Sequence, residues 1–133
     1  MTRVGDSAVG YSIESSRSLA TTVVVRAWGF WKSAVAERFA EDVLSAVTKS
    51  APFTVLFDLT ELKPQGYDGE KAFDAAIAAV SALSSFRCAA IVTTNALSKL
   101  QLNRLVRAQK QTRWVFVDSL ADAERALAAA SRS

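Results

Sequence analysis

The chain has no histidine and a single cysteine among its 133 residues. Without imidazole side chains it lacks the usual general base, the usual member of a catalytic triad and the usual zinc ligand. One cysteine cannot form an internal disulfide, which is typical of a reducing compartment, so we expect a cytoplasmic protein. Because Cys88 lies in an apolar run, we expect a packed core thiol and not a nucleophile. These absences predict a non-enzymatic protein with no metal and no cofactor.

Long hydrophobic runs are also absent. No stretch of about 18 apolar residues occurs, so we expect no transmembrane helix. The first residues lack the apolar stretch of a signal peptide. The length fits one domain, and we expect residues 1–133 to form it, with residues 1–7 as a loose N-terminal end.

Acidic residues are missing from one part of the chain. The net charge is only +3, but residues 75–117 contain no acidic side chain. Six basic side chains occupy that stretch: Arg87, Lys99, Arg104, Arg107, Lys110 and Arg113. The positive field of the protein should therefore come from this part of the chain.

The helix expected after Asn95 divides into two faces on a helical wheel. Leu102, Leu105 and Val106 share the arc that should face the sheet. The opposite arc is basic and includes one apolar residue; its members are Lys99, Leu100, Arg104, Arg107 and Lys110. Such a face suits an acidic protein surface, a phosphate-bearing ligand or an anionic membrane, and its simplest interpretation is a solvated helix face. We do not expect nucleic acid as a partner, because the overall charge is small and no reading motif is present.

Hydrophobic patterning predicts strands that alternate with helices. The strands are expected over residues 8–14, 21–28, 53–59, 87–94 and 114–118. The helices are expected over residues 33–47, 95–109 and 119–130. A further helix, marked by Phe73, Ile77 and Val80, is expected to end at about Leu83. Strands joined by helical crossovers pair in parallel, and the first hairpin adds an antiparallel edge. The fold class is therefore α/β, with a mixed, mostly parallel sheet of about five strands and four helices.

Polar residues follow several of the predicted strands. They are Asp58, Thr60, Thr93, Asn95 and Asp118. Ligands of open parallel sheets sit beyond the carboxyl ends of the strands, so this cluster is a candidate site. The competing interpretation is structural, because Asn95 is expected to cap a helix and a strand-end aspartate often accepts loop amides.

Three large rings, Trp28, Phe30 and Trp31, lie within four residues at the end of a predicted strand. They cannot all face one core. Exposed rings would suit a protein interface or an apolar ligand pocket. Ordinary packing beneath the first helix is the alternative.

From Val23 to Ala128 the sequence resembles the SpoIIAA-like branch of the STAS family, named for sulfate transporters and anti-sigma factor antagonists. The resemblance rests on four segments in order: residues 28–31 at a strand end, the strand Val55–Thr60, the strand Arg87–Val92 and the helix Asp118–Leu127. It implies a small sheet with helices largely on one side, and a role in protein recognition.

Members of that family that act as antagonists are switched by phosphorylation of a serine just before a glycine. The equivalent positions here are Asp68 and Gly69, and no serine lies between Asp58 and Ser81. The resemblance thus implies a chain without the phosphoserine switch. Asp68 would supply a fixed negative charge at a helix N-terminus, or would simply be its N-cap.

We therefore expect a non-enzymatic protein-interaction or regulatory module, forming a homodimer, whose protein partner the sequence does not identify. The alternative is a carrier or sensor of an apolar or lipid-like small molecule, held near residues 28–31.

Overall fold

The structure is a computed structural model that describes residues 1–47 and 52–131, and within them the chain forms six strands and five helical segments. The strands are β1 (Thr2–Gly5), β2 (Gly10–Ser15), β3 (Thr22–Gly29), β4 (Phe53–Leu62), β5 (Phe86–Val92) and β6 (Trp114–Val117). The helices are α1 (Ser33–Ala36), α2 (Phe39–Val47), α3 (Tyr67–Ser81), α4 (Ala96–Ala108) and α5 (Leu120–Ser131).

All six strands join one sheet in sequence order, from β1 to β6. The β1–β2 and β2–β3 pairs are antiparallel, and the pairs from β3 to β6 are parallel. The predicted mixed, mostly parallel sheet is confirmed. Because each parallel crossover has the same hand and moves one strand along, the helices within the crossovers lie on one face of the sheet.

The first residues do not form a loose end, as the sequence analysis expected. Thr2–Gly5 is an edge strand that pairs with β2. The connecting turn is stabilised by Asp6, whose carboxylate accepts the N–H groups of Ala8 and Val9 at 2.8 and 3.1 Å. These backbone hydrogen bonds lower the pKa of Asp6. A short polar turn closes this hairpin, and hydrophobic patterning does not detect it.

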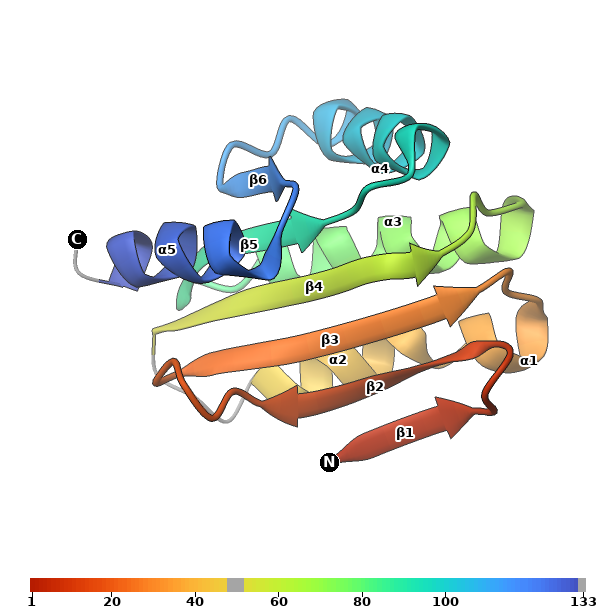
Figure 1. Cartoon of the computed structure of the whole chain (residues 1–133), viewed down its shortest axis with the longest axis horizontal. Coiled ribbons are helices and arrows are strands. Elements are labelled where there is room, and N and C mark those ends of the chain that lie inside the picture. Colours follow the sequence, from red (N-terminus) through yellow and green to blue (C-terminus); the bar gives the residue numbers. More distant parts are fainter. Residues whose placement is uncertain (48–51, 132–133) are drawn as a thin grey trace.

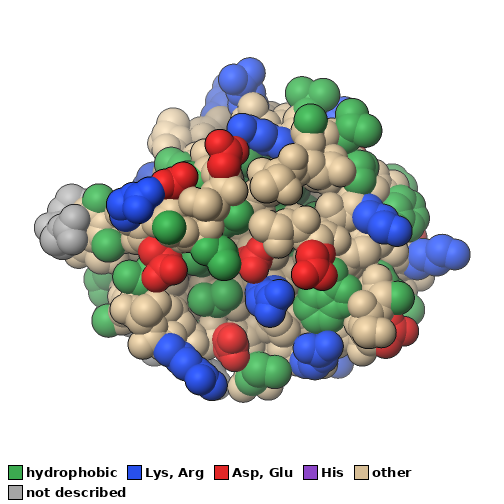
Figure 2. Space-filling view, viewed as in Figure 1, with side chains coloured by type: hydrophobic (Ala, Val, Ile, Leu, Met, Phe, Trp, Pro, Cys, Tyr) green, Lys and Arg blue, Asp and Glu red, His purple; other side chains and the backbone are tan. Residues whose placement is uncertain are grey.

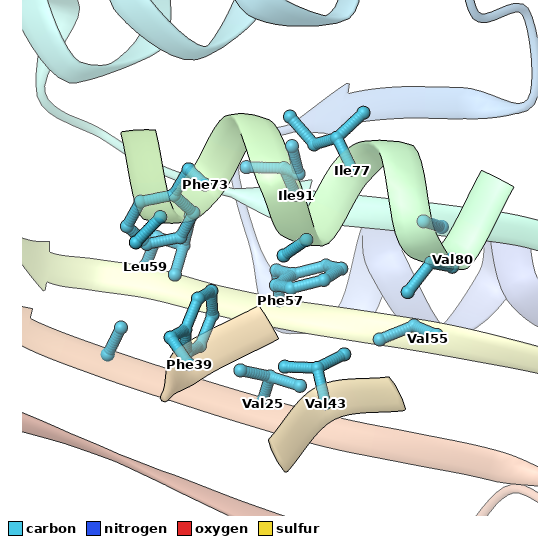
Figure 3. Packing of buried hydrophobic residues seen from close by; sticks show 14 of the residues in the cluster. Val25, Phe39, Val43, Val55, Phe57, Leu59, Phe73, Ile77, Val80 and Ile91 are labelled. Atoms are coloured by element: carbon cyan, nitrogen blue, oxygen red, sulfur yellow. The ribbon is translucent and has the colours of Figure 1, made fainter. Parts of the chain in front are cut away.

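The main core lies between the sheet and the helices α2 and α3 (Figures 1 and 3). Strand β4 is central and apolar along most of its length, as the sequence predicted. Figure 3 shows strand residues such as Val55 and Phe57 in the same core as Phe39 of α2 and Phe73 of α3, whose rings contact each other. Tight packing of large rings makes this face the major source of hydrophobic stabilisation.

Helix α5 lies on the opposite face of the sheet (Figure 1), against β4, β5 and β6. It buries Ala123 and Leu127 in a second cluster with Leu56, Cys88 and neighbouring small residues of the strands. The β1–β3 half of this face has no helix over it in Figure 1. The expectation of helices largely on one side therefore holds, with α5 as the exception.

The first predicted helix is divided in two. Glu37 and Arg38 separate α1 from α2. Helix α1 packs mainly on α3, whereas α2 packs on α3 and on the strands β2 and β3, so the two pieces bury different neighbours. In the part of the chain that the structure describes, no helix combines the length and apolarity needed to cross a bilayer.

Candidate functional site

The carboxyl ends of β3 and β4 are joined by the side chain of Gln65. The N–H of Trp31 donates to Gln65 Oε1 at 2.9 Å. Gln65 Nε2 donates to the carbonyl oxygens of Gly29 at 2.9 Å and Lys63 at 2.6 Å. Gly29 has a φ of +81°, and the Cβ of any other residue at this position would lie 2.4 Å from the Ala8 carbonyl oxygen. The turn therefore requires glycine.

The same glutamine connects the loop before α3 to helix α4. Its N–H donates to Gln101 Oε1 at 2.8 Å, and Gln101 Nε2 donates back to the Gln65 carbonyl at 2.7 Å. Gln101 Nε2 also donates to Glu70 at 2.9 Å, and Arg104 donates to both carboxylate oxygens of Glu70 at 2.8 Å. We call these four residues, Gln65, Gln101, Glu70 and Arg104, the glutamine bridge. The sequence analysis did not identify Gln65, Glu70 or Gln101. Gln65 and Gln101 are 36 residues apart, and a contact over that distance has no local signature in the sequence.

Asp68 and Gly69, the positions that the sequence resemblance equates with a switch site, lie next to this bridge. Asp68 is exposed in the first turn of α3, and Gly69 beside it is buried. A Cβ on Gly69 would lie 2.0 Å from Gln65 Oε1, so the glycine leaves room for the bridge. Asp68 is not the N-cap, as one interpretation of the sequence had it, since Gly66 occupies that position. Its carboxylate is near the positive end of the α3 dipole, which favours a negative charge.

The basic face of α4 is exposed, as the helical wheel predicted. Leu102, Leu105 and Val106 are buried. The exposed side chains are Lys99, Leu100, Arg104 and Arg107, with Lys110 just beyond the helix end. Figure 2 shows hydrophobic and basic side chains gathered at the top of the molecule, where Figure 1 draws α4.

A shallow groove of about 830 Å³ runs along this helix. We call it the α4 groove; its principal lining residues are Pro64, Leu97, Leu100, Gln101, Arg104 and Arg107. Leu97 and Leu100 are 65% and 68% exposed, which is unusual for leucine at adjacent positions of one helix face. The helical wheel did not single out Leu97, although its spacing of three residues from Leu100 places both on one face of the helix.

The three candidate rings at the end of β3 have separate environments. Trp31 is 1% exposed and contacts Tyr11, Phe39 and Phe73, so its proposed place in an interface or pocket is wrong. Phe30 is exposed and lies close to Gly66.

Trp28 is half-buried on the other face of the sheet. Its indole N–H donates to the Asp6 carbonyl at 2.7 Å, and Arg3 stacks on its ring. Only Trp28 belongs to β3, which ends at Gly29, so Phe30 and Trp31 leave the strand and the three rings do not form one patch.

The strand-end polar residues have mostly structural roles. Strand β4 continues four residues beyond Asp58 to Leu62, so Asp58 is not at a strand end. Its carboxylate accepts hydrogen bonds from Thr60 and faces Arg26 at 3.5 Å.

The other members of that predicted cluster have three different environments. Asn95 caps α4 by accepting the N–H groups of Leu97 and Ser98, both at 3.0 Å. Thr93 is buried, and in the described part of the chain its hydroxyl has no hydrogen-bond partner. Asp118 is exposed after β6.

The Cys88 thiol and the acidic side chains are the remaining candidates for nucleophilic or metal chemistry. Cys88 is buried, as predicted, and burial raises the pKa of its thiol, which disfavours the nucleophilic thiolate. Among the described residues, no three His, Cys, Asp or Glu side chains lie close enough together to hold a metal ion.

No family model and no curated protein matches the chain. Several solved structures do resemble this fold. One is an anti-sigma factor antagonist from Mycobacterium paratuberculosis, with a TM-score of 0.67 and 16% identity over 91% of this chain and 95% of the other. Another is an uncharacterized protein of the DUF3478 family from Shewanella loihica PV-4, described as having a SpoIIAA-like fold. It gives a TM-score of 0.69 and 18% identity over 93% of this chain and 98% of the other. The chain therefore has a SpoIIAA-like fold, as the resemblance of its sequence segments implied.

Proposed function

We propose that this chain is a non-enzymatic regulatory module of the STAS type that acts by binding a protein partner. The observation that carries the proposal is the surface around the start of α3. There Asp68 is exposed, and the sequence resemblance equates this position with the switch residue of the antagonists. The anti-sigma factor antagonist among the similar structures supports a regulatory role of this kind.

The module works without a phosphoserine switch. Asp68 carries a negative charge permanently, where a phosphorylated serine carries one only after modification. The glutamine bridge supports this surface, because it ties the loop before α3 to α4 and leaves little freedom for the first turn. A rigid surface lowers the entropic cost of binding a partner.

The buried thiol and the occupied carboxylate support a non-enzymatic protein. Cys88 is buried, and burial raises the pKa of its thiol, which disfavours attack on a substrate. Asp58 is engaged by Thr60 and Arg26. The carrier alternative has less support, because Trp31, around which its pocket was expected, is packed in the aromatic core. Cytoplasmic location and homodimer formation stay predictions.

The test is affinity capture from extracts of the source organism, followed by mass spectrometry. We expect one protein to be retained by the wild-type chain and by Asp68→Glu, but not by Asp68→Lys. Glu14→Lys makes the same charge change on an exposed residue of β2 and serves as the matched control. Equal capture by Asp68→Lys would refute a role for the fixed charge. A small molecule of constant mass seen in native mass spectrometry, with no captured protein, would favour the carrier alternative.

A further inference from the structure

We propose that the α4 groove binds an acidic amphipathic helix of the partner protein, with apolar residues over Leu97 and Leu100 and acidic residues over Arg104 and Arg107. This inference rests on the proposed function, since it names the chemistry of the partner. It adds a second contact surface to the one around Asp68.

The residues along α4 are arranged in two halves. Leu97, Leu100, Arg104 and Arg107 are spaced by three or four residues, so they follow one face of the helix. The two exposed leucines occupy the first half and the two arginines occupy the second. A partner helix that lies along α4 meets apolar surface at one end and positive charge at the other.

The charge of the groove is only partly neutralised within the chain. Arg104 is held by both carboxylate oxygens of Glu70. Within the described residues, neither Lys99 nor Arg107 forms an ion pair. Because residues 75–117 contain no acid, α4 itself supplies nothing to offset these charges. Charge complementarity therefore selects an acidic partner.

A protein helix suits this surface better than an anionic membrane. The acidic residues Glu70 and Asp74 of α3 border α4, where they bond to Arg104 and to Gln109. They would face and repel an anionic bilayer laid across both helices. A single helix is narrow enough to follow α4 alone, and apolar contacts at spacings of three and four residues are the usual mode of helix recognition.

The experiment uses the full chain and three hydrocarbon-stapled peptides of 13 residues, the length of α4. Stapling is needed because isolated helices of this length are marginal in water. The first peptide carries leucines in one half and glutamates in the other. The second replaces the glutamates by lysines, and the third replaces the leucines by serines. Binding is followed by amide chemical shifts and by the Kd.

We expect the first peptide alone to bind and to shift amides of α4 and of the loop at Pro64. Leu100→Ser and Arg107→Glu should each weaken its binding by about tenfold. Arg107→Glu should at the same time gain affinity for the lysine peptide, a change of preference that damaged folding does not produce. Arg87→Glu reverses an exposed charge of the same basic stretch on β5 and should leave the Kd unchanged.

Equal binding of the first two peptides, shifts that spare both α4 and the loop at Pro64, or no binding of the first peptide would each overturn the proposal. Co-sedimentation of the chain with phosphatidylglycerol vesicles, without peptide binding, would assign the groove to a membrane instead. Failure here leaves the capture experiment at Asp68 unaffected, so the two proposals can fail separately.

Discussion

The two faces of the sheet are packed with different kinds of side chain. On the face covered by α2 and α3, the rings of Tyr11, Trp31, Phe39 and Phe73 contact one another with centroids 4.8 to 5.5 Å apart. On the face covered by α5, the buried residues are small or aliphatic. Beyond α5, this second face carries polar contacts instead, such as the Arg26–Asp58 pair. Stability should therefore depend far more on the first face than on the second.

Exchanging Trp31 and Trp28 separately for alanine tests this comparison most strongly. Trp31→Ala should lower the free energy of unfolding by about 4 kcal/mol, because it removes a fully buried ring and leaves a cavity. Trp28→Ala, on the half-open face, should cost only about 1–2 kcal/mol. Urea denaturation followed by circular dichroism measures both values. Equal losses for the two variants would contradict the comparison.

Removing a fully buried leucine from the α5 cluster should have an intermediate effect. Leu127→Ala should cost about 2–3 kcal/mol, at the lower end for a buried leucine, because α5 lies at the edge of the molecule and can settle onto its small neighbours. Leu120→Ala at a half-exposed position of the same helix is the control and should cost well under about 1 kcal/mol. Thermal unfolding resolves this difference. A loss from Leu127→Ala as large as that from Trp31→Ala would show that the two faces contribute equally.

The smallest effect is expected at the rim of the aromatic face. Tyr11 donates its hydroxyl to Asp42 at 2.6 Å, and Tyr11→Phe should cost about 1 kcal/mol near neutral pH. Burial and the Asp42 hydrogen bond raise the pKa of Tyr11 above its ordinary value of 10.0. The folded state therefore holds the phenol proton more tightly than the unfolded state does.

This shift has a definite consequence at alkaline pH. The stability that comes from the raised pKa is fully present below about pH 10 and is lost as the pH rises further. The free energy of unfolding should thus fall more steeply above pH 10 for the wild type than for Tyr11→Phe. Parallel pH curves for the two proteins would mean that Tyr11 ionises alike in the folded and unfolded states.

Features that depend on near neighbours in the chain were predictable. The caps at Asn95 and Ser119, the inward arc of α4 and the burial of Cys88 all follow from spacing and composition. The parallel order of β3 to β6 follows from the alternation of strands and helices. In each case a local pattern is enough, because helix period, strand period and capping extend over only a few residues.

Other features were decided by contacts between distant parts of the chain. No local pattern distinguishes the buried Trp31 from the half-exposed Trp28. Trp28 lies in β3 and points to the face opposite α2 and α3, whereas Trp31 follows the strand and packs on Phe39 of α2 and Phe73 of α3. The glutamine bridge joins residues 31 to 36 positions apart, and Gly69 has its role only because Gln65 lies over it. The sequence alone thus determined the fold class and the exposed faces of its helices, through periodicity. Only the tertiary structure brought the start of α3 and helix α4 together into one surface, because side-chain hydrogen bonds between distant residues form only when the chain has folded.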